Sequence, residues 1–98
     1  MEDSVQHEDG KRFYISTGHG NAVLNYRLVH NGVMIAYHTF VPEQERGKGL
    51  AERLAVAAFD LAKERGLKVR PDCSYIIHFL DKHPEYRFLT EERQEEQV

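Results

Sequence analysis

The chain of 98 residues has the length of one small domain, since domains typically contain about 100–150 residues. Its composition, with 41% hydrophobic and 30% charged residues, excludes a collagen-like or wholly disordered chain and is sufficient for one hydrophobic core. The single cysteine excludes an internal disulfide, and no apolar stretch approaches the roughly 20 residues that span a bilayer. No signal-peptide pattern follows Met1, so the sequence predicts a cytoplasmic protein that binds no membrane.

Charge is distributed unevenly along the chain. Residues 1–9 carry four acidic and no Lys or Arg side chains, and residues 91–98 carry four acidic side chains against one arginine. Residues 10–90 hold 12 basic and 8 acidic side chains, which suits an anionic partner or an ordinary solvated surface. The sequence predicts one domain over residues 11–90 between mobile acidic ends at 1–10 and 91–98. The acidic ends argue against nucleic-acid binding.

The first half of the chain has the period of β-structure. Alternation predicts strands over residues 13–15, 22–29 and 33–41. One face of the second strand would carry Ala22, Leu24, Tyr26 and Leu28. Asn31-Gly32 is a strong hairpin signal because a type I′ turn needs positive φ at both positions. Pro42 ends the third strand.

The second half changes to a helical period. Apolar residues at three- and four-residue spacing predict a helix over residues 50–65, which Gly66 ends as a left-handed cap. A short strand over residues 67–69 and a second helix over residues 74–82 follow, and Pro84 comes after them. This order predicts an α+β fold, in which an antiparallel β-meander is followed by α-β-α with a mixed sheet.

A glycine-rich turn lies between the third predicted strand and the long helix. Gly47 and Gly49 let a ligand approach the backbone closely, and the first N–H groups of a helix have no partner within it. Arg46 and Lys48 add positive charge, so the turn suits a phosphate or pyrophosphate. Its spacing matches neither a Walker loop nor the dinucleotide fingerprint. A plain basic turn with two flexible glycines is the alternative.

Arg46-Gly47-Lys48-Gly49-Leu50-Ala51 resembles the Arg/Gln-x-x-Gly-x-Gly/Ala signature of the GNAT acetyltransferases, with Arg46, Gly49 and Ala51 in the signature positions. The likeness continues through Gly66-Leu67-Lys68-Val69, Cys73 and His83-Pro84-Glu85-Tyr86. The resemblance covers residues 12 to 89. This combination of motifs is similar to that of the small, single-domain YjdJ-like group of the family.

The resemblance implies a minimal GNAT-like fold and an N-acetyltransferase that uses acetyl-CoA as its cosubstrate. The backbone of the signature would hold the pyrophosphate, and the end of the third strand would pair with the pantetheine arm. The implied coenzyme A-binding residues are Thr39, Phe40, Val41, Arg46, Gly47, Lys48, Gly49, Leu50 and Ala51. Two usual features of the family have no counterpart: the two helices between the first and second strands, and a C-terminal β-arm after Leu89.

Two residues are candidates for chemistry. Cys73 precedes the second helix, whose free N–H groups would stabilise a thiolate, and the resemblance places it near the thioester as nucleophile or acid. A small buried apolar cysteine is the alternative. His38 alternates with Ala36 and Phe40 on the third strand, and is a candidate general base or a structural histidine.

Other polar residues give weaker signals. Tyr86 is expected to pack against the core, and Glu43 and Glu45 are expected to be solvated. The six histidines lack metal-ligand spacing, so no metal is predicted.

Three hypotheses follow, in order of preference. The first is an acetyltransferase that acts on an amine of a small molecule, protein or peptide, as a monomer or weak dimer. The second is a non-catalytic module that binds coenzyme A or an acyl-CoA. The third is a structural interaction domain with a basic turn.

Overall fold

The structure, a computed structural model, describes residues 4–91, and residues 1–3 and 92–98 lie outside it. The predicted acidic ends therefore fall partly outside the described residues. The strands are β1 (Gln6–Glu8), β2 (Arg12–Thr17), β3 (Gly20–Val29), β4 (Val33–Phe40) and β5 (Lys68–Pro71). The helices are α1 (Leu50–Arg65) and α2 (Ser74–Lys82), with short 3-10 helices η1 (Glu43–Glu45) and η2 (Pro84–Leu89).

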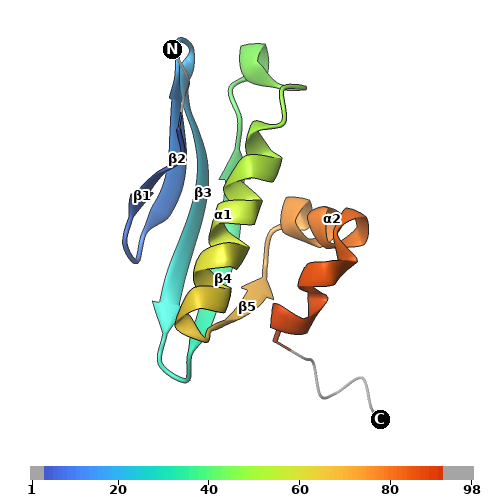
Figure 1. Ribbon diagram of the computed structural model, residues 1–98. Coiled ribbons are helices and arrows are strands. Elements are labelled where there is room, and N and C mark those ends of the chain that lie inside the picture. Colours follow the sequence, from blue (N-terminus) through green and yellow to red (C-terminus); the bar gives the residue numbers. More distant parts are fainter. Residues whose placement is uncertain (1–3, 92–98) are drawn as a thin grey trace.

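The strands form one sheet in the order β1-β2-β3-β4-β5, as Figure 1 shows. Neighbours from β1 to β4 are antiparallel, and β5 returns through α1 to pair with β4 in parallel. This arrangement confirms the predicted α+β fold, with an antiparallel meander followed by α-β-α.

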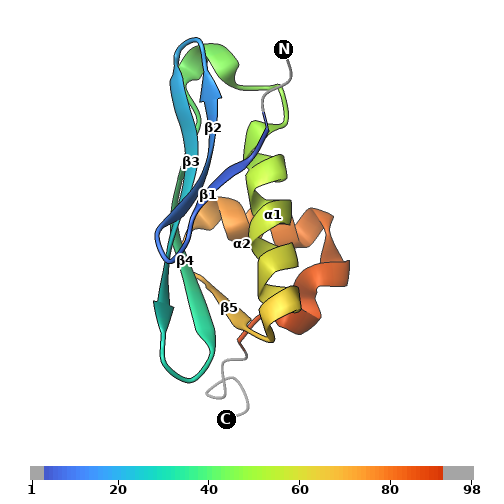
Figure 2. The same cartoon turned by 60° about the vertical axis from the view of Figure 1, so that its left-hand side comes forward.

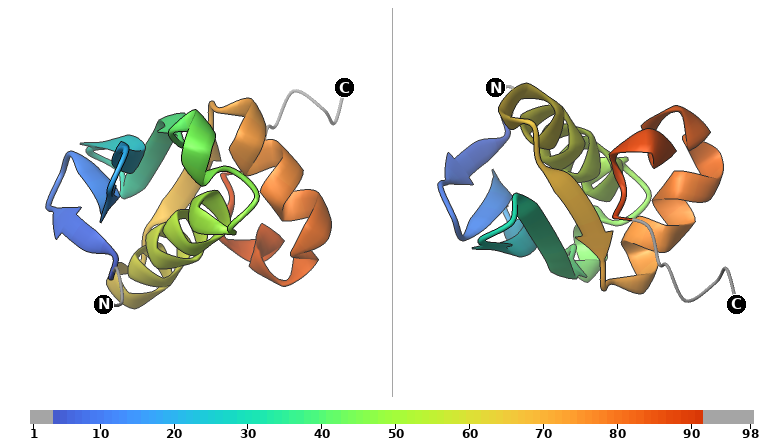
Figure 3. Two further views of the ribbon diagram at one scale, coloured as in Figure 1. Left: turned by 90° about the horizontal axis from the view of Figure 1, so that it is seen from above. Right: turned by 90° about the horizontal axis from the view of Figure 1, so that it is seen from below.

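Both helices lie on the same side of the sheet. α1 packs across β2, β3, β4 and β5, and α2 lies beside it (Figure 2). Figure 3 shows the sheet edge-on, with no helix on its other side within residues 4–91. The sheet therefore has an inner face, covered by the helices, and an outer face that no helix of the described residues covers.

One apolar core fills the space between the inner face and the helices. Its largest fully buried side chains are Tyr26, Phe59, Phe79, Ile15, Leu24, Met34, Leu54, Ile76 and Val69. The rings of Phe59 and Phe79 stack with centroids 5.6 Å apart, which ties α1 to α2. Leu28 was expected on the inner face but is 41% exposed, so the buried row of β3 ends at Tyr26.

A β-bulge divides β4 into two parts. Tyr26 pairs with Ala36, but the preceding Asn25 pairs with His38, so Tyr37 is the extra residue of the bulge. Because directly opposed residues point to the same face, the bulge exchanges the two faces for the rest of the strand. Thr39, opposite buried Leu24, therefore faces the helices.

Three elements, β1, η1 and η2, were not predicted from the sequence. β1 pairs with β2 within the segment expected to be a mobile end, and the His7 ring stacks on Phe13 at 4.2 Å. The 3-10 helix η2 leads the chain back to the sheet, where the Glu91 N–H donates to the Val69 carbonyl at 2.9 Å. β1 and β2 form a local hairpin, whereas the contact after η2 joins segments far apart in sequence.

Candidate functional site

An open groove of about 420 Å³ lies between the end of β4 and the N-terminus of α1. We call it the α1 groove. It is lined by Thr39, Phe40, Val41, Glu45, Arg46, Gly47, Gly49, Leu50, Ala51, Glu52 and Tyr75. The set contains every residue for which the GNAT resemblance implies coenzyme A binding, except Lys48.

The backbone at the start of α1 is arranged as a donor site. Gly47 and Gly49 have φ of 84° and 80°, in the left-handed region that glycine adopts without strain. A Cβ atom at either position would meet no heavy atom within 4 Å, so both glycines border open space. The Arg53 N–H makes the first helical bond, to the Gly49 carbonyl at 3.1 Å. The N–H groups just before it lie at the positive end of the helix dipole, which suits an anion.

Arg46 lines the α1 groove beside the end of β4. Its Nε donates to the Val41 carbonyl at 2.9 Å, and its guanidinium lies 6.0 Å from the centre of the Phe40 ring. These contacts hold Arg46 against the end of β4, where it still contributes positive charge to the groove.

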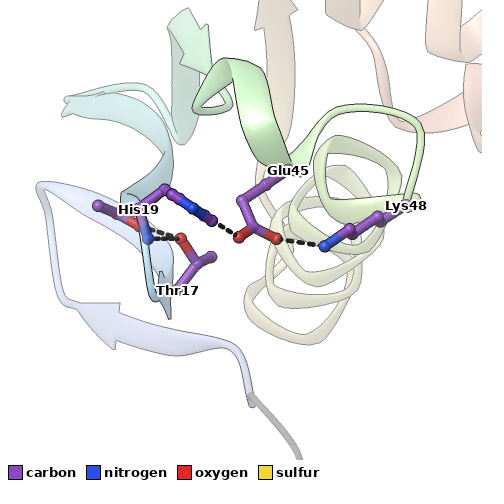
Figure 4. A network of polar contacts seen from close by, with 5 residues as sticks. Thr17, His19, Glu45 and Lys48 are labelled. Carbon is purple, nitrogen blue, oxygen red and sulfur yellow. Dashed lines mark hydrogen bonds and ion pairs between the residues drawn. The ribbon is translucent and has the colours of Figure 1, made fainter.

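Glu45 is the only buried charged residue within residues 4–91, with 8% of its surface exposed. Figure 4 shows its carboxylate between His19, from the β2–β3 turn, and Lys48. The His19 Nδ1 lies 2.7 Å from Oε2, and the Lys48 Nζ donates to Oε1 at 2.9 Å. The hydrogen bond to His19, and to a smaller extent the one to Lys48, lowers the pKa of Glu45. The expectation that Glu45 is solvated is wrong, because η1 turns it toward a partner 26 residues earlier in the chain.

Cys73 lies where β4 and β5 separate. Their pairing ends at Ala36 and Pro71, after which β4 stays paired with β3 only and the chain after β5 turns into α2. Cys73 is the N-cap residue of α2, and its Sγ donates to the Thr39 hydroxyl at 3.3 Å. Since Thr39 lines the α1 groove, the half-buried thiol is one hydrogen bond away from it.

His38 lies on the outer face of β4. It is exposed and pairs with Asn25, whereas Ala36 is buried on the inner face. The alternation expected from the sequence would place His38 and Ala36 on the same face of the strand. This expectation is wrong, because the bulge at Tyr37 shifts the register by one residue. His38 borders the gap between β4 and β5 from the side opposite Thr39.

Sequence reasoning missed two kinds of residue in the site. Tyr75, from the first turn of α2, and Glu52 both line the α1 groove. Burial, and then the charge of Glu52, raises the pKa of Tyr75, which keeps this phenol protonated as a donor at neutral pH. His19 supports the groove through Glu45. No local motif marks Tyr75 or His19, because they reach the site through tertiary packing, whereas Glu52 directly follows Ala51 on α1.

Within residues 4–91, no group of three or more His, Cys, Asp or Glu side chains is placed to hold a metal ion. None of the helices described there is long and apolar enough to cross a membrane. Tyr86 packs against Phe59 and Phe79, with ring centroids 5.3 Å and 5.7 Å away.

Comparison with known proteins agrees with this geometry. A family model described as GCN5-related N-acetyl-transferase matches residues 12–89. The chain is 35% identical over 88 residues to Protein NATD1 of Danio rerio, covering 87% of this chain and 80% of that one. Identity to Protein NATD1 of Homo sapiens is 34% over 88 residues, covering 87% and 78%.

A solved structure shares the fold. The NMR solution structure of a GCN5-like protein from Staphylococcus aureus superposes with a TM-score of 0.73 at 27% identity, covering 92% of this chain and 89% of that one. The chain belongs to the GCN5-related N-acetyltransferase (GNAT) family.

Proposed function

We propose that this protein is an acetyl-CoA-dependent N-acetyltransferase that transfers an acetyl group to an amine, with Cys73 near the thioester. The α1 groove is the observation that carries the proposal. It joins the end of β4 to open glycines and free N–H groups at a helix N-terminus, in a chain of the GNAT family. These features suit the phosphates and the amide-bearing arm of coenzyme A.

Residues of the groove have separable roles in this proposal. The backbone from Gly47 to Ala51 binds the pyrophosphate, assisted by the charges of Arg46 and Lys48. The end of β4, Thr39 to Val41, lines the path of the pantetheine arm. Bound acetyl-CoA supplies an activated acyl group, and the amine acceptor must lose a proton.

Two side chains border the gap between β4 and β5 from opposite sides. Cys73 holds a proton at Sγ, hydrogen-bonded to Thr39, and is positioned on the groove side. His38, exposed on the outer face, is the proposed proton acceptor on the side from which an amine approaches.

The proposal is tested by calorimetric titration with acetyl-CoA, followed by an assay of free thiol release with a panel of amines and peptides. We expect micromolar binding and saturable thiol release that depends on the acceptor. No detectable heat, together with an unchanged melting temperature in saturating acetyl-CoA, contradicts the proposal.

A second candidate is a non-catalytic module that binds coenzyme A or an acyl-CoA. The short connection between β2 and β3 favours it, because only residues 18–19 lie where the family usually places two helices. This candidate predicts binding without turnover. Saturable transfer that is lost on a single substitution at Cys73 would exclude it.

A further inference from the structure

No helix covers the outer face of the sheet within residues 4–91 (Figure 3). This face carries a hollow of about 520 Å³. We call it the outer-face hollow. Three cationic side chains, Lys11, Arg12 and Arg27, line it together with Asn25 and Tyr37. None of the described residues that line it is acidic. The hollow therefore combines positive charge with an aromatic and an amide side chain.

The cationic side chains that line the hollow retain N–H groups that can bind a ligand. Arg27 lies over the Tyr37 ring, 5.1 Å from its centre, and stacking on a ring leaves the in-plane N–H groups of a guanidinium able to donate. The Arg12 Nε is 3.4 Å from the Glu8 carboxylate, a half-exposed pair that solvent screens strongly. Lys11 is exposed. A carboxylate is the ligand that matches such guanidinium forks in charge and geometry.

The position of the hollow relates it to the α1 groove. Tyr37 follows Ala36, the last residue of β4 that pairs with β5, and precedes His38 on the outer face. Thr39, two residues further on, faces the groove and contacts Cys73. At about 3.3 Å per residue along a strand, the hollow begins within about 10 Å of the gap between the two strands.

We propose that the outer-face hollow binds an acidic segment of a peptide or protein acceptor and so presents its amine at the gap between β4 and β5. This inference rests on the proposed function and names the class of acceptor. A nucleic acid is disfavoured, because its binding needs a continuous basic stripe, whereas only three cationic side chains line this hollow.

The test measures peptide binding without acetyl transfer. The probe is an eight-residue peptide with a free N-terminal amine, three glutamates and a C-terminal fluorophore, and glutamine replaces each glutamate in its matched control. We expect fluorescence anisotropy to show saturable binding of the glutamate peptide only. Arg27→Glu should weaken that binding by about tenfold or more, since charged hydrogen bonds are among the strong ones.

Control variants keep the test specific. Lys82→Glu makes the same change in net charge at an exposed position on α2, outside the hollow, and should leave peptide affinity within about twofold. Arg27→Gln, a milder change, should weaken binding by several-fold, and circular dichroism verifies that each variant is folded. The inference is overturned if Lys82→Glu loses as much peptide affinity as Arg27→Glu, or if the glutamine peptide binds as tightly as the glutamate peptide. It is also overturned if a single-stranded RNA of the same length binds more tightly than the glutamate peptide.

Failure of the inference is distinguishable from failure of the proposed function. Coenzyme A is titrated into the same variants, and Arg27→Glu should bind it within about twofold of wild type because the groove lies on the other face of β4. A protein that binds coenzyme A but not the glutamate peptide overturns only the inference. One that binds the peptide but not coenzyme A supports the hollow and contradicts the proposed function.

Discussion

The α1 groove and the outer-face hollow lie on the two faces of β4 and use positive charge in different ways. In the groove, Lys48 is paired with Glu45, and Arg46 is bonded to a backbone carbonyl, so the open donors are N–H groups of the helix N-terminus. In the hollow, Lys11 and Arg27 face solvent without a buried counterion among the described residues. The groove should therefore be sensitive to backbone geometry, and the hollow to side-chain charge.

The largest effect is expected from blocking the backbone of the groove. Gly49→Val places a branched side chain at φ 80° and into the open space that the ligand would occupy. We expect calorimetric titration to show coenzyme A binding weakened by about 100-fold or more, a loss of about 2.7 kcal/mol.

Gly32→Val is the matched control for that substitution. Gly32 has φ 75° and equally open surroundings, but it lies in the β3–β4 turn. It should cost similar stability without weakening coenzyme A binding. Equal loss of binding in both variants would mean that strain, and not the site, explains the Gly49 result.

Cys73 contacts Thr39 of the α1 groove where the pairing of β4 and β5 has ended, so its removal tests whether chemistry takes place there. Under the proposed function, Cys73→Ala should lower kcat for acetyl transfer by about 100-fold, the lower end of what positioned proton transfer contributes, with little change in the KM for acetyl-CoA. Steady-state thiol-release kinetics measure both constants. A lower melting temperature with unchanged kcat would indicate a packing role.

The effects of substituting Glu45 and Lys48 on coenzyme A binding should be strongly coupled, because the two side chains form an ion pair. Lys48→Gln leaves the Glu45 carboxylate without one of its two partners beside an anion site, and should weaken coenzyme A binding by about tenfold. The double variant Glu45→Gln/Lys48→Gln removes the repulsion and should recover most of this loss. Calorimetric titration of both single variants and the double variant measures this coupling. If the losses of binding free energy in the single variants add up to the loss in the double variant, Lys48 contacts the ligand independently of Glu45.

The smallest effect is a pH dependence of stability at the groove. Because its partners lower the pKa of Glu45, the charged form stabilises the folded protein at neutral pH. This contribution is lost as pH falls through the ordinary glutamate pKa of about 4.3 toward the lowered one. The melting temperature of wild type should therefore exceed that of Glu45→Gln at pH 7, and the difference should shrink toward pH 3. A constant difference would assign the effect to packing.

Much of the candidate site was predictable because it is local in sequence. Residues 39–41 and 46–51 form one strand end, one turn and one helix start, which strand alternation, glycine spacing and helical periodicity predict, and the resemblance to the GNAT family implied their role in coenzyme A binding. Glu45 lies within the same stretch, yet its burial was missed because its partner His19 comes from the β2–β3 turn. Tyr75 was missed for the same reason, since α2 brings it to the groove.

The sequence by itself determined the order of elements from β2 to α2, the boundaries of both α-helices and the β3–β4 hairpin, and the glycine-rich, basic composition of the turn before α1. These follow from backbone preferences and periodicities that neighbouring residues define. Only the tertiary structure decided the face on which His38 lies, because one extra residue at Tyr37 changes the strand register. It also decided that both α-helices pack on the same face of the sheet and that Cys73 meets Thr39, 34 residues earlier in the chain. Such contacts depend on how the helices pack on the sheet, which no local pattern encodes.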